Sequence, residues 1–219
     1  MSSNNLKKST TRIPKQERSI QRFESVVAAT LKLLSERSYE SISMREIARE
    51  AEMPIASVYQ YFPTKLAIVQ ELWERYANLV FNHLEADLQE VGADTDIGLL
   101  INRVVDLMVS VQQEQTAYNE VWACVAAAPE LRDKNIQDTL RTSEVVTKAM
   151  VNMSPHTPSS NEREVLHSIS LIMCESAGAT TKLAMTLPEE LRKQTIAQLK
   201  QALRWMYEGA IRQMNDDFR

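Results

Sequence analysis

Residues 55–61, with the sequence IASVYQY, place an amide, hydroxyl groups and small apolar side chains within a segment that carries no charge. The Gln60 amide can pair with the edge of adenine, and the Ser57 hydroxyl can donate or accept a hydrogen bond. The candidate contacts to bases or phosphates in this segment are Ile55, Ala56, Ser57, Tyr59, Gln60 and Tyr61. Polar side chains on a short, rigidly held helix are what reading of the DNA major groove requires.

Lys65, Arg45 and Ser43 add candidate contacts around this segment. We expect Lys65 in the first turn of a helix, where backbone N–H groups and the helix dipole attract a phosphate. Arg45 could reach guanine or a phosphate, and a surface arginine is the alternative. Ser43 is expected to cap a helix, and it can also contact a phosphate because a helix N-terminus attracts anions.

Two short helices joined by a tight turn must position these side chains, and the sequence predicts them within residues 43–65. Ser43 and Glu46 form a Ser-x-x-Glu capping box at the start of the first helix. Pro54 begins the second helix, because the N–H that proline lacks would have no partner there. Thr64 is expected to cap the longer helix that follows.

The spacing of apolar residues sets the orientation of the second short helix. Val58 and Phe62 lie four residues apart and are expected to face the interior. The side chains then turned outward are Ser57, Gln60 and Tyr61, with Tyr59 at the edge. For each of the two tyrosines, a place in the core is the alternative.

The composition predicts an all-α fold. Apolar residues make up 44% of the 219 positions, Gly and Pro number only 4 and 7, and alternating β-branched runs are missing. No apolar run approaches the roughly 18–20 residues of a membrane span, and we expect no secretory signal. Two isolated thiols, Cys124 and Cys174, indicate a reducing cytoplasm without a disulfide. About nine helices are expected, over residues 19–36, 43–51, 54–62, 64–91, 97–113, 116–127, 130–152, 161–186 and 189–215.

Charge is unevenly spread along the chain. Residues 1–65 carry 11 Lys and Arg against 7 Asp and Glu, a net charge of +4, and residues 66–219 carry 14 against 22, a net charge of −8. A basic module on an acidic body indicates that one end meets a polyanion. We expect a disordered basic arm at 1–17, a helix-turn-helix domain at 18–65 and a larger helical domain at 66–219. The residues expected to add salt-sensitive attraction are Lys7, Lys8, Arg12, Lys15, Arg18 and Arg22.

Residues 19–75 resemble the TetR/AcrR family of bacterial transcription regulators. The resemblance is carried by SMREIA at 43–48, VYQYF at 58–62 and PTK at 63–65. It implies a three-helix DNA-binding module with a helix-turn-helix and a phosphate-contacting lysine at Lys65. It also implies that the remaining helices form a domain that binds an effector and dimerises.

The chain departs from the family pattern where bases would be read. Glu52 lies in the turn between the two short helices, where the family usually has Gly. A glutamate disfavours a positive φ angle, so the turn could be a variant. Pro54 and Ile55 stand where Ser or Thr and a basic residue are common, which leaves the fold intact and the base preference open.

A homodimer is expected, because one such module buries too little surface for tight, specific binding. Two-fold symmetry then requires double-stranded DNA with an inverted-repeat operator. The last two helices are the candidate interface, since residues 174–180 offer small side chains for close approach. A second apolar stripe on the last helix contains Leu199, Leu203, Met206 and Ala210. An intramolecular core contact is the alternative for these residues.

Methionines and aromatic residues in the larger domain suggest a pocket for a small apolar effector. The candidate pocket residues are Met108, Tyr118, Trp122, Cys124, Met150, Met173 and Cys174, each of which could instead be plain core. No metal or other cofactor is expected, because His83, His156 and His167 are scattered. No Gly-rich phosphate loop or Ser–His–Asp pattern is visible, so we do not expect an enzyme.

These features predict a transcriptional repressor that an apolar small molecule releases from its operator. An activator or a ligand-independent repressor is the alternative within the same class. A helical adaptor whose N-terminal helices meet protein is an alternative from another class, and an all-α enzyme is a third. The basic N-terminal module argues against the adaptor, and the lack of a clustered acid, base or nucleophile argues against the enzyme.

Overall fold

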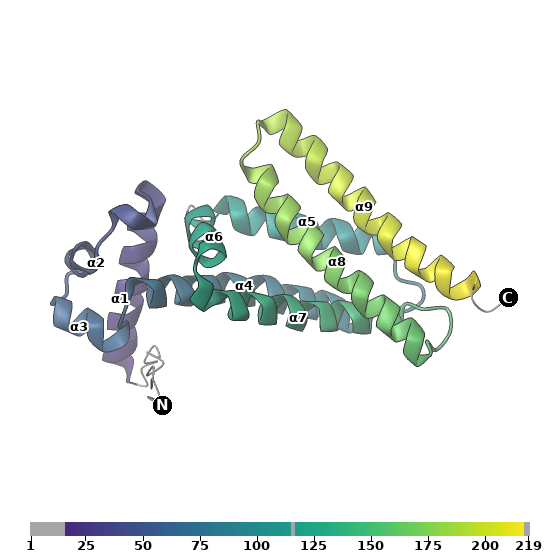
Figure 1. Ribbon diagram of the computed structural model, residues 1–219, viewed down its shortest axis with the longest axis horizontal. Helices are drawn as coiled ribbons and strands as arrows, with labels where there is room; N and C mark the ends of the chain where they lie inside the picture. The colour runs from purple at the N-terminus through teal and green to yellow at the C-terminus, as the bar shows by residue number, and fades with distance from the viewer. Residues whose placement is uncertain (1–15, 115–116, 217–219) are drawn as a thin grey trace, which may run out of the picture. The chain divides into compact units, whose positions relative to one another are not determined.

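The computed structural model describes residues 16–114 and 117–216, and within them it contains nine α-helices, one short 3-10 helix and no strand. The all-α prediction is confirmed, and each helix lies within two residues of its predicted ends. The elements are α1 (Glu17–Glu36), η1 (Tyr39–Ser41), α2 (Met44–Glu50), α3 (Ile55–Tyr61), α4 (Lys65–Gln89), α5 (Ile97–Glu114), α6 (Tyr118–Ala127), α7 (Pro129–Asn152), α8 (Ser160–Met185) and α9 (Glu189–Asp216) (Figure 1).

Contacts between helices divide the chain into two compact units. Unit 1 holds the residues up to Arg75 together with the segment that ends at Leu131, which contains α6. Unit 2 holds the segment that starts at Tyr76 and the chain from Arg132 onward. The predicted boundary at residues 65 and 66 assigned α6 to the larger domain, whereas in the structure α6 contacts α1 and η1. Of the predicted arm at residues 1–17, all but the last two residues lie outside the described part of the chain.

The start of α2 is fixed by the predicted capping box. The Ser43 hydroxyl accepts the backbone N–H of Glu46 at 3.3 Å, and the Ser43 N–H donates to the Glu46 carboxylate at 2.9 Å. The Arg37 guanidinium donates to the same carboxylate at 2.9 Å. This ion pair, together with the hydrogen bonds from Ser43, lowers the pKa of Glu46 to about 2. The cap therefore also ties the end of α1 to the start of α2.

The turn between α2 and α3 is a Schellman motif with a glutamate at its left-handed position. The Met53 N–H donates to the Ala48 carbonyl at 2.9 Å, and the Glu52 N–H donates to the Arg49 carbonyl at 3.1 Å. Glu52 has a φ angle of 52° and is the single non-glycine residue with a positive φ angle in the described chain. The turn therefore keeps the geometry that glycine favours, although a glutamate stands there.

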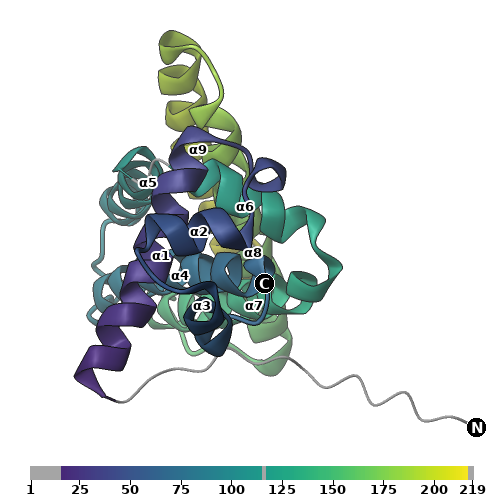
Figure 2. The same cartoon turned by 90° about the vertical axis from the view of Figure 1, so that its left-hand side faces the viewer.

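The core of unit 1 includes the region where α1, α2 and α3 pack against one another (Figure 2). The ring of Phe23 lies 4.6 Å from that of Phe62, measured between centroids. The fully buried side chains of this unit include Val26, Ile47, Val58 and Ile68. Since each helix contributes a buried face, α3 is held by packing although it has only seven residues.

Unit 2 is a bundle in which α8 and α9 lie side by side (Figure 1). A second capping box starts α8, where the Ser159 N–H donates to the Glu162 carboxylate at 2.7 Å. One apolar cluster joins residues of α4, α5, α7, α8 and α9, among them Leu84, Leu100, Met150, Leu166 and Ala210. A smaller cluster joins α5, α8 and α9 around Val105, Ala177 and Leu203. The side chains of five helices therefore enclose the interior of this unit.

The left-handed residue in the turn gives a stability prediction. Glu52→Gly should raise the free energy of unfolding by about 0.5–1 kcal/mol, because glycine adopts a positive φ angle without the steric cost that a Cβ atom brings. Equilibrium unfolding in urea measures the change. The matched control is Arg49→Gly in α2, which should lower stability by about 1 kcal/mol. A Glu52→Gly protein less stable than the parent would contradict this account of the turn.

Candidate nucleic-acid interface and interior cavity

The outer face of α3 presents uncharged side chains to solvent. Tyr59 is 49% exposed, and Ala56 and Gln60 are also exposed. Ile55 and Ser57 are half-buried, and Val58 on the opposite face is fully buried. Five of the six residues of α3 that were predicted to contact DNA are therefore at least partly accessible to solvent. The opposite face of the helix packs in the core.

Tyr61 lies on the inner side of α3, and the expectation that it faces outward is wrong. Its side chain is only 8% exposed, and its ring packs edge-on against Phe23 at 6.2 Å between centroids. Its hydroxyl lies 3.0 Å from the Ser19 hydroxyl on α1. The reason is helical geometry, since Tyr61 follows Val58 by three residues and so shares its buried face. Tyr59, which was expected at the edge, is the exposed tyrosine.

Exposed cations lie on α2 beside α3. Arg45 and Arg49 are both exposed, and within the described residues neither forms an ion pair. Sequence reasoning selected Arg45 and missed Arg49, although the spacing of four residues already put both on one side of a helix. Ser43 is exposed too, and its hydroxyl is engaged in the capping box. The α2–α3 pair therefore combines available positive charge with an uncharged polar surface.

Lys65 is turned toward its own unit. Its ammonium group donates to the Tyr39 carbonyl at 2.5 Å and to the Ile42 carbonyl at 2.6 Å. It also lies 3.9 Å from the centre of the Tyr39 ring. Burial lowers the pKa of Lys65. In this conformation the lysine joins the first turn of α4 to the η1 segment.

The first residues of α6 belong to the same unit. The Glu120 carboxylate accepts the Tyr39 N–H at 3.3 Å, so α6 contacts the η1 segment that Lys65 also binds. The rings of Trp73 and Trp122 lie 5.1 Å apart between centroids, and Tyr118 lies 6.4 Å from Trp73. Three nominated pocket residues, Tyr118, Trp122 and Cys124, are thus on α6 in unit 1. No local signal in the sequence separates them from the residues of unit 2.

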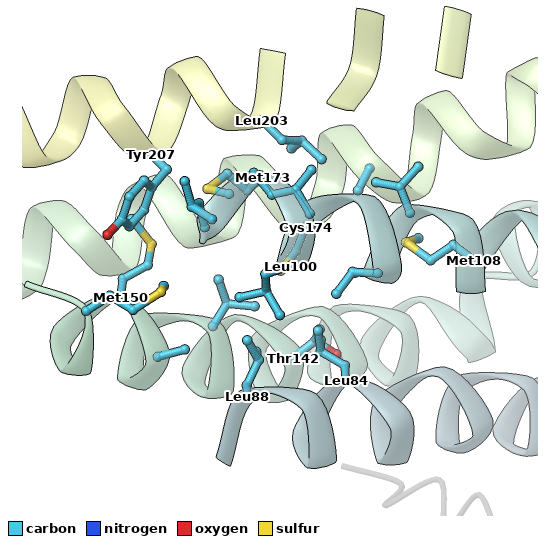
Figure 3. A pocket seen from close by; sticks show the side chains of 18 of the residues that line it. Leu84, Leu88, Leu100, Met108, Thr142, Met150, Met173, Cys174, Leu203 and Tyr207 are labelled. Atoms are coloured by element: carbon cyan, nitrogen blue, oxygen red, sulfur yellow. The ribbon is translucent and has the colours of Figure 1, made fainter. Parts of the chain in front are cut away.

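A cavity of about 130 Å³ lies within unit 2 (Figure 3). The other nominated pocket residues, Met108, Met150, Met173 and Cys174, all line it. The lining residues that sequence reasoning missed are Val80, Leu84, Leu88, Ile97, Leu100, Ile101, Val104, Val105, Thr142, Val146, Ala149, Met153, Ala177, Leu203 and Tyr207. Most are aliphatic residues of ordinary helix stripes, which look like plain core in a sequence.

Other kinds of site receive no support within the described ranges. No helix there is long and apolar enough to cross a membrane. No three His, Cys, Asp or Glu side chains in those ranges gather closely enough to hold a metal ion. His156 pairs with Glu162 at 3.0 Å, and His83 lies 2.8 Å from the Leu79 carbonyl.

Two family sequence profiles match the chain. The profile described as "Bacterial regulatory proteins, tetR family" matches residues 26–72, which contain α2, α3 and the start of α4. The profile described as "Tetracyclin repressor-like, C-terminal domain" matches residues 95–207, more than half of the chain. The chain belongs to the TetR family. Its members are bacterial regulatory proteins that bind DNA through the helix-turn-helix that α2 and α3 form here.

One named repressor is similar to this chain over a limited stretch. The HTH-type transcriptional repressor KstR of Mycolicibacterium smegmatis is 28% identical over 76 residues, which are 35% of this chain and 32% of KstR. The match thus spans about a third of that repressor's length.

Solved TetR-type structures share the fold along most of the chain. A TetR-family regulator from Streptomyces coelicolor is 21% identical, with a TM-score of 0.61 over 87% of this chain and 99% of that one. A transcriptional regulator from Rhodococcus sp. Rha1 is 16% identical, with a TM-score of 0.64 over 86% of this chain and 97% of that one. At these identities the likeness concerns the fold alone.

The position of Lys65 leads to a prediction that separates a structural role from a phosphate contact. Lys65→Met should lower the free energy of unfolding by about 1–3 kcal/mol, because two charge-assisted hydrogen bonds are lost. The slope of log affinity for DNA against log salt concentration should stay unchanged. Lys32→Met, which removes an exposed lysine of the same unit, should change stability by less than about 0.5 kcal/mol. A slope reduced by about one unit would show instead that the TetR-type phosphate contact forms on DNA.

Proposed function

We propose that the protein is a homodimeric repressor that binds an inverted-repeat operator and leaves it when an apolar effector enters the cavity of unit 2. The observation that carries this proposal is the uncharged outer face of α3, held rigidly by the core beneath it. Ala56, Tyr59 and Gln60 are exposed there, while Val58, Tyr61 and Phe62 are buried. An enzyme or a protein adaptor would not require this pairing of an exposed polar helix with available arginines.

We assign the reading of DNA bases to α3. We assign the contacts to the DNA phosphate backbone, which position the protein, to α2. Gln60 carries an amide that can pair with adenine in the major groove, and Ala56 is small enough to meet a thymine methyl group. Arg45 and Arg49 lack ion-pair partners within the described chain and can neutralise phosphates without first breaking an internal bond. The repressor assignment draws support from the similarity to KstR, which is named as a transcriptional repressor.

Dimerisation is assigned to α8 and α9, which present large apolar side chains to solvent in the single chain. Trp205 is 59% exposed, Leu183 is 58% exposed, and Ile172 and Leu191 are also largely exposed. A Cβ atom added at Gly178 would meet no atom within 4 Å, and the same holds at Gly209. Their small size therefore serves no packing within this chain, and it suits close approach of a partner helix.

Effector control is assigned to α4. Ile68, Val69 and Leu72 of this helix are buried in unit 1, and Val80, Leu84 and Leu88 line the cavity of unit 2. An effector that fits better when the cavity side of α4 is displaced would favour that state. Because the same helix anchors α3, the population of dimers with correctly spaced recognition helices would fall.

Base readout by α3 can be tested once an operator has been selected from random duplex pools. Gln60→Ala should weaken binding to that operator by about 1–3 kcal/mol per contact and relax the base preference at one position of each half-site. Fluorescence anisotropy at fixed salt concentration measures both effects. Gln137→Ala, an exposed glutamine of α7, is the control and should bind like the parent. Enrichment of no inverted repeat, or equal binding by Gln60→Ala, would overturn the assignment.

Dimerisation through α8 and α9 gives a separate prediction. Trp205→Ala should raise the dimer dissociation constant by at least about 30-fold, since buried tryptophan anchors at interfaces contribute about 2 kcal/mol or more. Sedimentation velocity over a dilution series measures the constant. Leu99→Ala, which removes a residue 63% exposed on α5, is the matched control and should leave it unchanged. A dimer as tight in Trp205→Ala as in the parent would place the interface elsewhere.

A further inference from the structure

The cavity of unit 2 contains no charged group that could receive an ionic ligand. None of its lining residues in the described chain is Lys, Arg, His, Asp or Glu. An ion without a partner in such surroundings would lose its hydration and gain nothing in return. Such a lining therefore favours an uncharged ligand.

The few polar atoms in the lining are weak or already engaged. The Thr142 hydroxyl donates to the Asp138 carbonyl of its own helix at 2.8 Å. The Cys174 thiol is partly buried, and burial raises its pKa to about 12, which keeps it protonated. Tyr207 carries a hydroxyl that could meet one weak polar substituent. A ligand with several hydroxyl or amide groups would leave most of them without partners.

The size of the cavity restricts the ligand further. Its volume of about 130 Å³ is close to the roughly 150 Å³ of an engineered apolar protein cavity that accepts benzene. A single six-membered ring with one or two small substituents fills such a space. A sterol, a long acyl chain or a fused polycycle exceeds this volume and would extend beyond the cavity.

Sulfur atoms distinguish this cavity from an ordinary aliphatic one. Met108, Met150, Met153 and Met173 line it together with the Cys174 thiol (Figure 3). Figure 3 shows the labelled ones, Met108, Met150, Met173 and Cys174, on three helices, α5, α7 and α8. Thioethers make favourable contacts with aromatic rings, and each such contact corresponds to roughly a twofold to tenfold gain in affinity.

We infer that the ligand of this cavity is a compact, uncharged molecule built on a single aromatic ring. This inference rests on the proposed function for its regulatory meaning, since an effector site is assigned to the same cavity. The chemistry of the ligand itself follows from the size of the cavity, its lack of charge and its thioethers.

The test compares four probes on the full-length protein without DNA, by isothermal titration calorimetry and thermal unfolding. Toluene should bind saturably and raise the unfolding temperature. Methylcyclohexane is similar to toluene in size but has no aromatic π-system, so it should bind about tenfold more weakly than toluene. Benzoate, which adds a charge, and biphenyl, which adds a ring, should each show no saturable binding.

Three variants test whether toluene binds in this cavity. Ala149→Leu fills the space and should abolish toluene binding, and its unfolding temperature without ligand shows whether it folds. Met173→Leu keeps the volume but removes one thioether, so it should lower the preference for toluene over methylcyclohexane and leave methylcyclohexane binding intact. Met206→Leu, on α9 but outside the lining, is the matched control and should leave both affinities unchanged.

Equal affinity for toluene and methylcyclohexane, saturable binding of benzoate or biphenyl, or no binding of toluene would overturn the inference. Operator binding is measured separately. Toluene that binds in the cavity without weakening operator binding would uphold the ligand class and contradict the proposed effector mechanism. Operator release by a charged or polycyclic compound bound in unit 2 would contradict the ligand class and uphold the proposed effector mechanism.

Discussion

The continuity of α4 is the constraint on which the rest of the structure depends. This helix runs for 25 residues from Lys65 to Gln89 and contains neither Gly nor Pro. Its first turns bury Ile68 and Leu72 in the core beneath α3, and its last turns present Leu84 and Leu88 to the cavity. An uninterrupted helix of this length lacks the usual causes of a sharp bend. The same helix therefore supplies buried side chains to both units.

The anchoring of α4 in unit 1 is polar as well as apolar. The Arg75 guanidinium binds the Glu24 carboxylate of α1 through two hydrogen bonds of 2.7 Å each. Ten residues earlier, the Lys65 ammonium binds two carbonyls next to α2. Lys65 binds the carbonyl of Tyr39, and the Glu120 carboxylate of α6 accepts the N–H of the same residue. Both α4 and α6 therefore bind the backbone of Tyr39. The recognition helix is thus held by a module that also includes a helix from the middle of the chain.

The sequence predicted those features of the fold that local physics decides. Helix positions followed from apolar spacing and caps, and the Ser43–Glu46 box formed as expected because both partners lie within one turn. Glu52 was flagged as a residue opposed to a positive φ angle, and it adopts one because two hydrogen bonds of the turn and the packing of α3 outweigh its local preference.

Features decided by distant contacts were not predictable in the same way. The spacing from Val58 already favours burial of Tyr61 over Tyr59, but the ring on α1 that Tyr61 packs against, Phe23, is not visible in the local sequence. All seven predicted pocket residues are methionines, cysteines or aromatic residues. The four on α5, α7 and α8 line the cavity, whereas the three on α6 lie in unit 1. Composition identifies residues suited to a pocket, but the assignment of helices to units determines which of them meet.

The size of the cavity also limits how a ligand could control DNA binding. A ring with one substituent has about seven non-hydrogen atoms, and the ceiling of about 1.5 kcal/mol per atom allows at most roughly 10 kcal/mol of binding free energy. Moving a two-state equilibrium from 1:99 to 99:1 requires about 5.5 kcal/mol of difference in affinity between the states. A single small ligand would have to spend more than half of its maximum on that difference. Two ligands, one in each protomer of a dimer, would share the requirement at under about 3 kcal/mol each, so joint switching of two protomers would lower the difference in affinity that each small ligand has to supply.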